Sequence, residues 1–264
     1  MYILNGGITS NVIRSQITKE MLLSMSDVES ALFLALAHAF NETNALTRML
    51  YWAANAPTRN DAEEHGRFSM MLLLIQILAG KLYEFWGIFQ KQFFKTKLSD
   101  DLEPLLSGEP ADALLKLKRY FNKSPNSVKI IRNKFAFHYS PQEVSASLPG
   151  VDDQLELYTD DQNVPNNLFY FAEVILAHEI ASALGQTDPH KALEGLVEEL
   201  FDLSLCFSQT SDGLMDQILE RQKKKLPQRE AEVVQFDSLM HFKDVFLPWF
   251  TYTTGAHEPA TGSA

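Results

Sequence analysis

Cysteine is nearly absent from this sequence, since Cys206 is the single one among 264 residues. A lone cysteine excludes an intramolecular disulfide and a zinc site made of several thiolates, and it fits a reducing compartment. The longest apolar run, FSMMLLLIQILAG at 68–80, falls short of the roughly 20 residues that cross a bilayer. The first residues have neither the basic start nor the apolar core of a signal peptide. We expect a cytoplasmic protein without a membrane segment.

The glycine-rich and histidine-rich motifs of common enzymes are missing as well. Gly80-Lys81 lacks the upstream glycine of a P-loop, and neither a dinucleotide-binding fingerprint nor a nucleophile elbow occurs. His178-Glu179 is followed by Ser182, where a zinc protease needs its second histidine. No histidine has a glutamate three positions before it, as a di-iron bundle requires. We therefore expect no cofactor and no metal.

Positive charge is scarce overall. The chain has 23 lysines and arginines against 34 aspartates and glutamates, which gives a formal net charge of -11. Such a chain is a poor non-specific binder of polyanions, so we expect no DNA binding and only a local site for RNA. Acidic residues, in turn, are missing between Ala113 and Gln142, a stretch that contains Lys116, Lys118, Arg119, Lys123, Lys129, Arg132 and Lys134. Either these cations pair with acidic neighbours elsewhere in the fold, or they form a patch for phosphates.

Apolar residues recur at three- and four-residue spacing while alternation of period two is almost absent, so the sequence predicts an all-α helical bundle. Ser26, with Glu29 three residues later, predicts a capping box and a helix towards Ala53. A second helix, apolar nearly all round, is expected from about 61 to 94 in the core. Ser124-Pro125 is expected to open a third helix. A further helix from 188 is expected to break near 208–213.

The chain is expected to form a single helical domain over 1–250. Its core would cover about 26–185 and a C-terminal helical extension 186–250, with a disordered tail at 251–264. The polar segment around 152–160 is either a loop insertion or a short β-hairpin at the edge of the bundle.

The helix that begins after Pro125 carries polar residues in an apolar setting. A helical wheel places Val128, Ile131, Phe135 and Tyr139 on one stripe, which Arg132 and His138 border on its two edges. Six residues correspond to about 120° on an ideal helix, so these two side chains do not meet on a continuous one. A helix end near 137, or a two-fold axis that joins two copies, would bring them together.

At these residues the sequence resembles the HEPN superfamily, all-α domains whose ribonuclease members carry an arginine followed after four to six residues by a histidine. The match is Arg132, Asn133, four further residues and His138. The resemblance implies metal-independent RNA cleavage by a homodimer: His138 acts on the ribose 2′-hydroxyl, Arg132 stabilises the phosphate charge, and Asn133 orients one of them. It also implies a toxin–antitoxin or phage-defence setting. Substrate contacts are expected from Arg119, Lys129, Lys134 and Tyr139.

The same spacing occurs a second time, from Arg59 to His65, among the acidic residues Asp61, Glu63 and Glu64. These carboxylates would repel RNA, so the context favours the later pair. The alternative function is a non-catalytic, oligomeric interaction or scaffold protein with Arg132 and His138 at the interface. A small-molecule binder between helices has no polar cluster in an apolar segment to support it.

Overall fold

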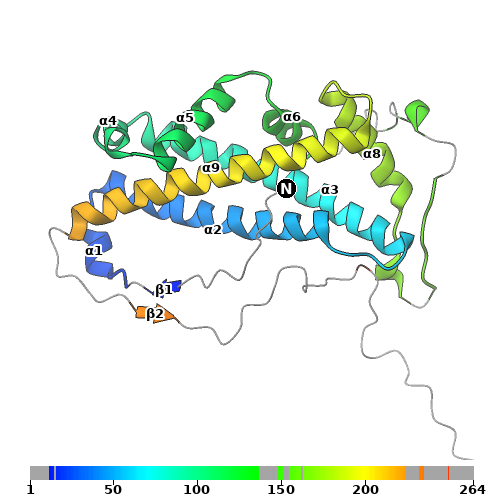
Figure 1. The fold of residues 1–264 in the computed structure, drawn as a ribbon, viewed down its shortest axis with the longest axis horizontal. Coiled ribbons are helices and arrows are strands. Elements are labelled where there is room, and N and C mark those ends of the chain that lie inside the picture. Colours follow the sequence, from blue (N-terminus) through cyan, green and yellow to red (C-terminus); the bar gives the residue numbers. More distant parts are fainter. Residues whose placement is uncertain are drawn as a thin grey trace, which may run out of the picture.

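The computed structural model describes residues 12–14, 16–136, 145, 148–151, 155–161, 163–223, 232–234 and 249. Within them the protein is an all-α helical bundle, as the sequence predicts. Three long helices, α2 (Asp27–Asn55), α3 (Asp61–Ile88) and α9 (Pro189–Lys223), run side by side along the longest axis (Figure 1). The shorter α5 (Glu109–Asn122) and α6 (Ser127–Lys134) cover one side of them.

The remaining elements are short, except for α8. They are α1 (Lys19–Ser24), η1 (Phe89–Phe93), α4 (Leu98–Leu102), η2 (Glu103–Leu105), η3 (Leu148–Gly150), η4 (Val164–Asn166) and α8 (Tyr170–Ala183). Two three-residue strands, β1 (Val12–Arg14) and β2 (Glu232–Val234), pair antiparallel with Val12 opposite Val234. The hairpin considered near 152–160 consists, in its described part, of one antiparallel bridge between Tyr158 and Leu168. The tail at 251–264 lies outside the described residues.

Helices α2 and α3 begin where the sequence predicts. The Ser26 hydroxyl accepts from the Glu29 amide, and the Glu29 carboxylate accepts from the Ser26 amide, which completes the capping box of α2. Asn60 caps α3 by accepting from the Glu63 amide at 3.0 Å. Helix α3 continues without interruption into the π-helical turn η1, so the helical stretch reaches Phe93.

The stretch Asp61–Phe93 is, among the described residues, the one helix long and apolar enough to cross a membrane by length and composition. The longest apolar run in the sequence is shorter than this helix, because scattered polar residues interrupt the apolar residues of the helix. More than half of the most apolar window is buried inside the protein, as is usual for the central helix of a bundle.

Helix α9 belongs to the main core. Phe207 stacks on Phe85 of α3 with ring centroids 4.5 Å apart, and Leu200 and Leu214 are fully buried. The predicted extension 186–250 therefore begins with a helix that packs against α2, α3, α5 and α8.

The predicted break near 208–213 is wrong, because α9 is continuous through these residues. Their small side chains allow close packing instead. A Cβ at Gly213 would lie 2.6 Å from the Cβ of Pro110 and 3.2 Å from a methyl carbon of Leu106, so only glycine fits this approach of α9 to α5. Ser211 and Thr210 beside it are fully buried. Thr210, Ser211 and Gly213, part of a segment whose composition is typical of a turn, therefore lie where α9 packs against its neighbours.

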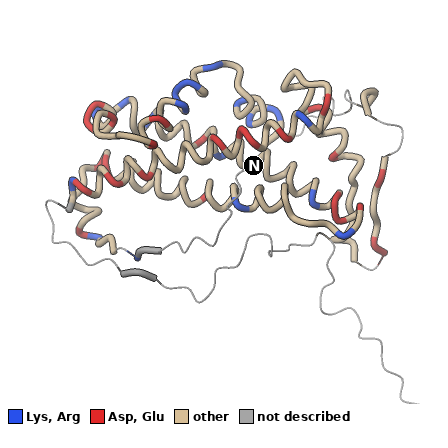
Figure 2. The backbone as a smooth tube through the Cα atoms, viewed as in Figure 1, with Lys and Arg blue, Asp and Glu red and all other residues tan. Residues whose placement is uncertain are grey.

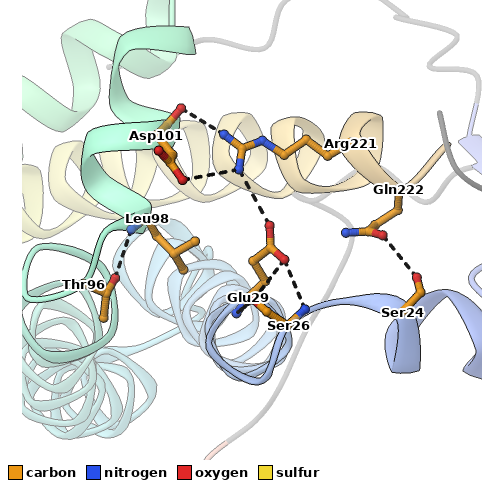
Figure 3. Close-up of polar contacts among 8 residues, drawn as sticks. All are labelled: Ser24, Ser26, Glu29, Thr96, Leu98, Asp101, Arg221 and Gln222. Carbon is orange, nitrogen blue, oxygen red and sulfur yellow. Dashed lines mark hydrogen bonds and ion pairs between the residues drawn. The ribbon is translucent and has the colours of Figure 1, made fainter.

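The first and last long helices are joined at one end of the bundle (Figure 3). The Arg221 guanidinium lies 3.7 Å from the Glu29 carboxylate and donates at 3.0 Å to the backbone carbonyl of Asp101. One helical position further, the Gln222 side chain accepts from the Ser24 hydroxyl at 3.1 Å. These contacts hold α1, α2, α4 and α9 together.

Candidate functional site

The helix that carries Arg132 starts at a different residue from the one predicted. Asn126 is its N-cap and accepts from the Lys129 amide at 2.9 Å, so Ser124-Pro125 lies before the helix. Asn126 is also buried, and its Nδ2 donates to the Lys123 carbonyl at 3.0 Å. Asn126 therefore pairs an otherwise unbonded amide of the first turn and also binds a loop carbonyl. Ser124 and Pro125 cannot do both from their position before the helix.

The N-terminus of α6 is fastened to α5 and α9 through Glu199. The Tyr120 hydroxyl and the Ser127 hydroxyl both donate to this carboxylate, the latter at 3.0 Å. The Tyr120 oxygen in turn accepts from the Val128 amide at 3.1 Å. Burial and the Glu199 partner raise the pKa of Tyr120 above its ordinary value. Neutral Tyr120 therefore acts as a fixed link among three helices.

The predicted apolar stripe of α6 faces the core. Val128, Ile131 and Phe135 are buried, and α6 packs against α3. Helix α6 ends at Lys134, with Phe135 as its C-cap. The angle of about 120° between positions 132 and 138 assumes one continuous helix, so it does not apply. His138 and Tyr139 lie outside the described residues.

Arg132 emerges at the edge of this stripe and is held by α3. Its Nη2 donates to the Glu84 carboxylate at 3.2 Å, and its guanidinium carbon lies 5.1 Å from the Tyr83 ring centroid. Its Nη1 donates to the Asn133 side-chain oxygen at 3.2 Å. Its Nε is buried and has no hydrogen-bond partner among the described residues, while 38% of the side chain is exposed. The guanidinium is thus oriented and partly exposed, whereas its Nε is shielded from solvent.

Basic residues gather on α5 and α6, whereas acidic residues are spread along α9 (Figure 2). Lys118 pairs with Glu103, so part of the cationic stretch is neutralised locally. Four other cations of these two helices and the loop between them have no carboxylate within ion-pair distance in the described part of the chain. They are Lys123 and the predicted substrate contacts Arg119, Lys129 and Lys134. Lys129 is half-buried and the other three are exposed. We refer to these four residues as the α5–α6 basic surface.

The second arginine–histidine pair has a different environment. The Arg59 side chain is bound to Glu63, four residues on, and this hydrogen bond lowers the pKa of the Glu63 carboxyl. Arg59 is therefore engaged by a carboxylate, as Arg132 is by Glu84, so ion pairing does not distinguish the two arginines.

His65 is part of a small cluster between α3 and the segment that precedes α8. Its ring stacks on Tyr170 at 3.6 Å with an interplanar angle of 4°. Its Nδ1 lies 2.9 Å from the Tyr158 hydroxyl and 3.1 Å from the Glu156 carboxylate, and that hydroxyl donates to the same carboxylate at 3.0 Å. Burial, followed by the Glu156 partner, raises the pKa of Tyr158 to about 12. These contacts give His65 a structural role that attaches the segment to α3.

A hollow of about 160 Å³ lies between α2 and α3, beside Arg132. Its apolar lining includes Ala35 and Phe85, and its polar lining comes from His38, Glu42, Thr43, Lys81 and Glu84. We call it the α2–α3 hollow. Nothing in the sequence revealed it, because its residues come from two helices about 45 positions apart and their polar members are spaced like an ordinary solvated helix face. The contact of Glu84 with Arg132, 48 positions away, was missed for the same reason.

Three or more His, Cys, Asp or Glu side chains in a metal-binding arrangement do not occur among the described residues. No family model, curated protein or solved structure matches the chain.

Proposed function

We propose that this protein is a metal-independent endoribonuclease of HEPN type, with Arg132 and His138 as its catalytic residues. The observation that carries the proposal is the state of Arg132. It is oriented by Glu84 and Tyr83, and 38% of its side chain is exposed. It also shares α6 with two cations of the α5–α6 basic surface, Lys129 and Lys134. A guanidinium presented in this way suits the oxygens of a phosphodiester.

The proposed reaction needs only a base, an internal nucleophile and a fixed cation. His138 removes the proton of a ribose 2′-hydroxyl, the 2′-oxygen attacks the adjacent phosphorus, and the bond to the 5′-oxygen of the next nucleotide breaks. The products are a 2′,3′-cyclic phosphate and a 5′-hydroxyl, which takes up a proton. Arg132 stabilises the negative charge that accumulates on the phosphoryl oxygens. A histidine titrates in the right pH range for this step, and a preorganised cation is effective in a partly enclosed site.

The neighbouring residues have supporting roles in this proposal. Asn133 orients the Arg132 guanidinium, to which it is already hydrogen-bonded. Arg119, Lys129 and Lys134 hold the RNA backbone, and Tyr139 lines the site. The protein acts as a cytoplasmic homodimer in a toxin–antitoxin or phage-defence setting, as the family resemblance implies.

Glu84 competes with RNA for Arg132. Arginine carries five N–H donors, of which two are engaged by Glu84 and Asn133 and the Nε–H is buried. A phosphate can bind the second N–H of Nη1 and of Nη2 without complete displacement of the carboxylate. Glu84 is 61% exposed, so its movement exposes little buried surface. We therefore assign Glu84 a positioning role.

The proposal is tested by incubating a mixed RNA pool with purified protein in excess EDTA and analysing the product ends. We expect the wild type to produce 2′,3′-cyclic phosphates, and His138→Ala and Arg132→Ala to cut at least about 100-fold more slowly, as for removal of a general base or an oxyanion stabiliser. Arg59→Ala is the matched control, since it removes the arginine of the second pair, and it should cut at the wild-type rate. Absence of cutting by a well-folded wild type, or equal cutting by His138→Ala, would contradict the proposal.

A second candidate is a non-catalytic interaction protein. The observation in its favour is the set of large apolar side chains that α2, α3 and α9 expose, namely Leu34, Leu73 and Leu205. In that case Arg132 and His138 bridge subunits. His138→Ala would then weaken self-association in analytical ultracentrifugation, and the wild type would show no RNA cleavage.

A further inference from the structure

The α2–α3 hollow has the size and lining of a site for one planar ring. Its volume of about 160 Å³ is well below the roughly 300–1,000 Å³ of pockets for drug-sized ligands. Ala35 and Ala39 lie one turn apart on α2, and their small side chains leave the space open towards Phe85 and Ile88 of α3. Apolar walls of this kind bury the faces of a ring, while polar groups at the rim recognise its edge.

The rim of the hollow offers mainly acceptors. Glu42 contacts Lys81 Nζ at 2.6 Å and His38 Nε2 at 3.7 Å, and Glu84 lines the hollow as well. An ionised carboxylate has about four lone-pair sites, so both glutamates keep free acceptor capacity. Two carboxylates against one lysine make the rim unfavourable for a phosphate. It is favourable for a group that donates N–H bonds, such as the amino group of a nucleobase.

The hollow adjoins the proposed catalytic arginine through a shared residue. Glu84 lines the hollow and accepts from Arg132 Nη2 at 3.2 Å, so a single carboxylate separates the two sites. A phosphate on Arg132 and the base of an adjoining nucleotide in the hollow would therefore share Glu84 as a neighbour.

We infer that the α2–α3 hollow is the base subsite of the proposed endoribonuclease and prefers a base that carries an exocyclic amino group. The inference rests on the proposed function for the placement of the phosphate. Cytosine is preferred over uracil because its N4 amino group donates to Glu42 or Glu84, where uracil presents a carbonyl oxygen that these carboxylates repel. Adenine is preferred over hypoxanthine for the same reason.

The experiment compares fluorescently labelled hexauridine with the same oligomer carrying one central cytidine. Every ribose carries a 2′-O-methyl group in both oligomers, so neither is cut at any position, and affinity is measured by fluorescence anisotropy in EDTA. We expect the cytidine oligomer to bind at least about fivefold more tightly to the wild type, as for one good contact to a base edge. Ala35→Leu fills the hollow and should abolish the preference. Ala31→Leu, at an exposed position of the same helix, should retain it.

Equal affinity for the two oligomers, no binding of either, or a cytidine preference that survives in Ala35→Leu would overturn the inference. If Ala35→Leu does not fold, the double substitution Glu42→Gln/Glu84→Gln takes its place, because it removes both acceptor charges without adding volume, and an unchanged preference in this variant has the same meaning. Binding is measured without cleavage, so the two proposals fail separately. A cytidine preference without RNA cutting refutes the endoribonuclease alone, and RNA cutting without any base preference refutes the base subsite alone.

Discussion

Single carboxylates that serve two partners recur in this molecule. Glu29 completes the capping box of α2 and also faces Arg221 of α9. Glu199 accepts from two hydroxyls on α5 and α6. A carboxylate can accept several hydrogen bonds at once, so one residue fixes the relative position of two helices.

Tyr158 should make the protein sensitive to alkali. Its pKa is raised to about 12 in the fold, whereas an unfolded tyrosine titrates near 10. The folded state therefore binds the proton more tightly, and the contribution of Tyr158 to stability is complete below pH 10 and is lost as the pH rises towards 12. We expect the free energy of unfolding, measured in urea between pH 9 and 12, to fall less steeply for Tyr158→Phe than for the wild type. Parallel curves for the two proteins would show that Tyr158 titrates normally.

At the scale of elements, α9 shows why local sequence signals are ambiguous. The residues around Gly213 have the composition of a turn, yet they are helical because their small side chains allow α9 to approach Pro110 and Leu106. The helix starts at Asp27 and Asp61 were predictable, since they depend on side chains within three residues of each other. The start of α6 was not, because the choice of Asn126 depends on a buried loop.

Two glycines of α9 should respond to alanine in opposite directions. Gly213→Ala places its Cβ against Pro110 and should lower the free energy of unfolding by about 1–3 kcal/mol, as for overpacking of a core. Gly195→Ala has no neighbouring atom within 4 Å and should raise it by about 0.5–1 kcal/mol through reduced backbone entropy of the unfolded chain. Urea unfolding of both variants checks this prediction. A stabilising Gly213→Ala would contradict the packing of α9 on α5.

At the scale of the whole molecule, the all-α class followed from hydrophobic periodicity, whereas the candidate site depends on tertiary contacts. Arg132 and the acid-free segment around it could be picked out from the sequence, but its partner Glu84 and the α2–α3 hollow could not. Their residues become neighbours only when α2, α3 and α6 pack together. His138 and Tyr139 lie outside the described residues, so their placement stays a prediction.

The junction around Arg221 should contribute measurably to the stability of the whole bundle. Arg221→Gln removes the partner of Glu29, whose side chain is only 15% exposed, and we expect a loss of about 1–2 kcal/mol in urea unfolding. Lys191→Gln is the matched control, because Lys191 of the same helix forms a solvent-exposed pair with Asp188, which precedes the helix, and its loss should cost less than about 0.5 kcal/mol. Equal effects of the two substitutions would show that the junction is no more than a surface contact.

The stack of Phe85 on Phe207 also has a consequence for biosynthesis. During translation Phe85 leaves the ribosome well before Phe207, and at roughly 5–20 residues per second the delay is on the order of ten seconds. The hairpin of α2 and α3 spends this interval with its aromatic face uncovered. Contacts between segments so distant in the chain also form slowly. The nascent protein therefore presents this apolar surface to other molecules until α9 has been synthesised.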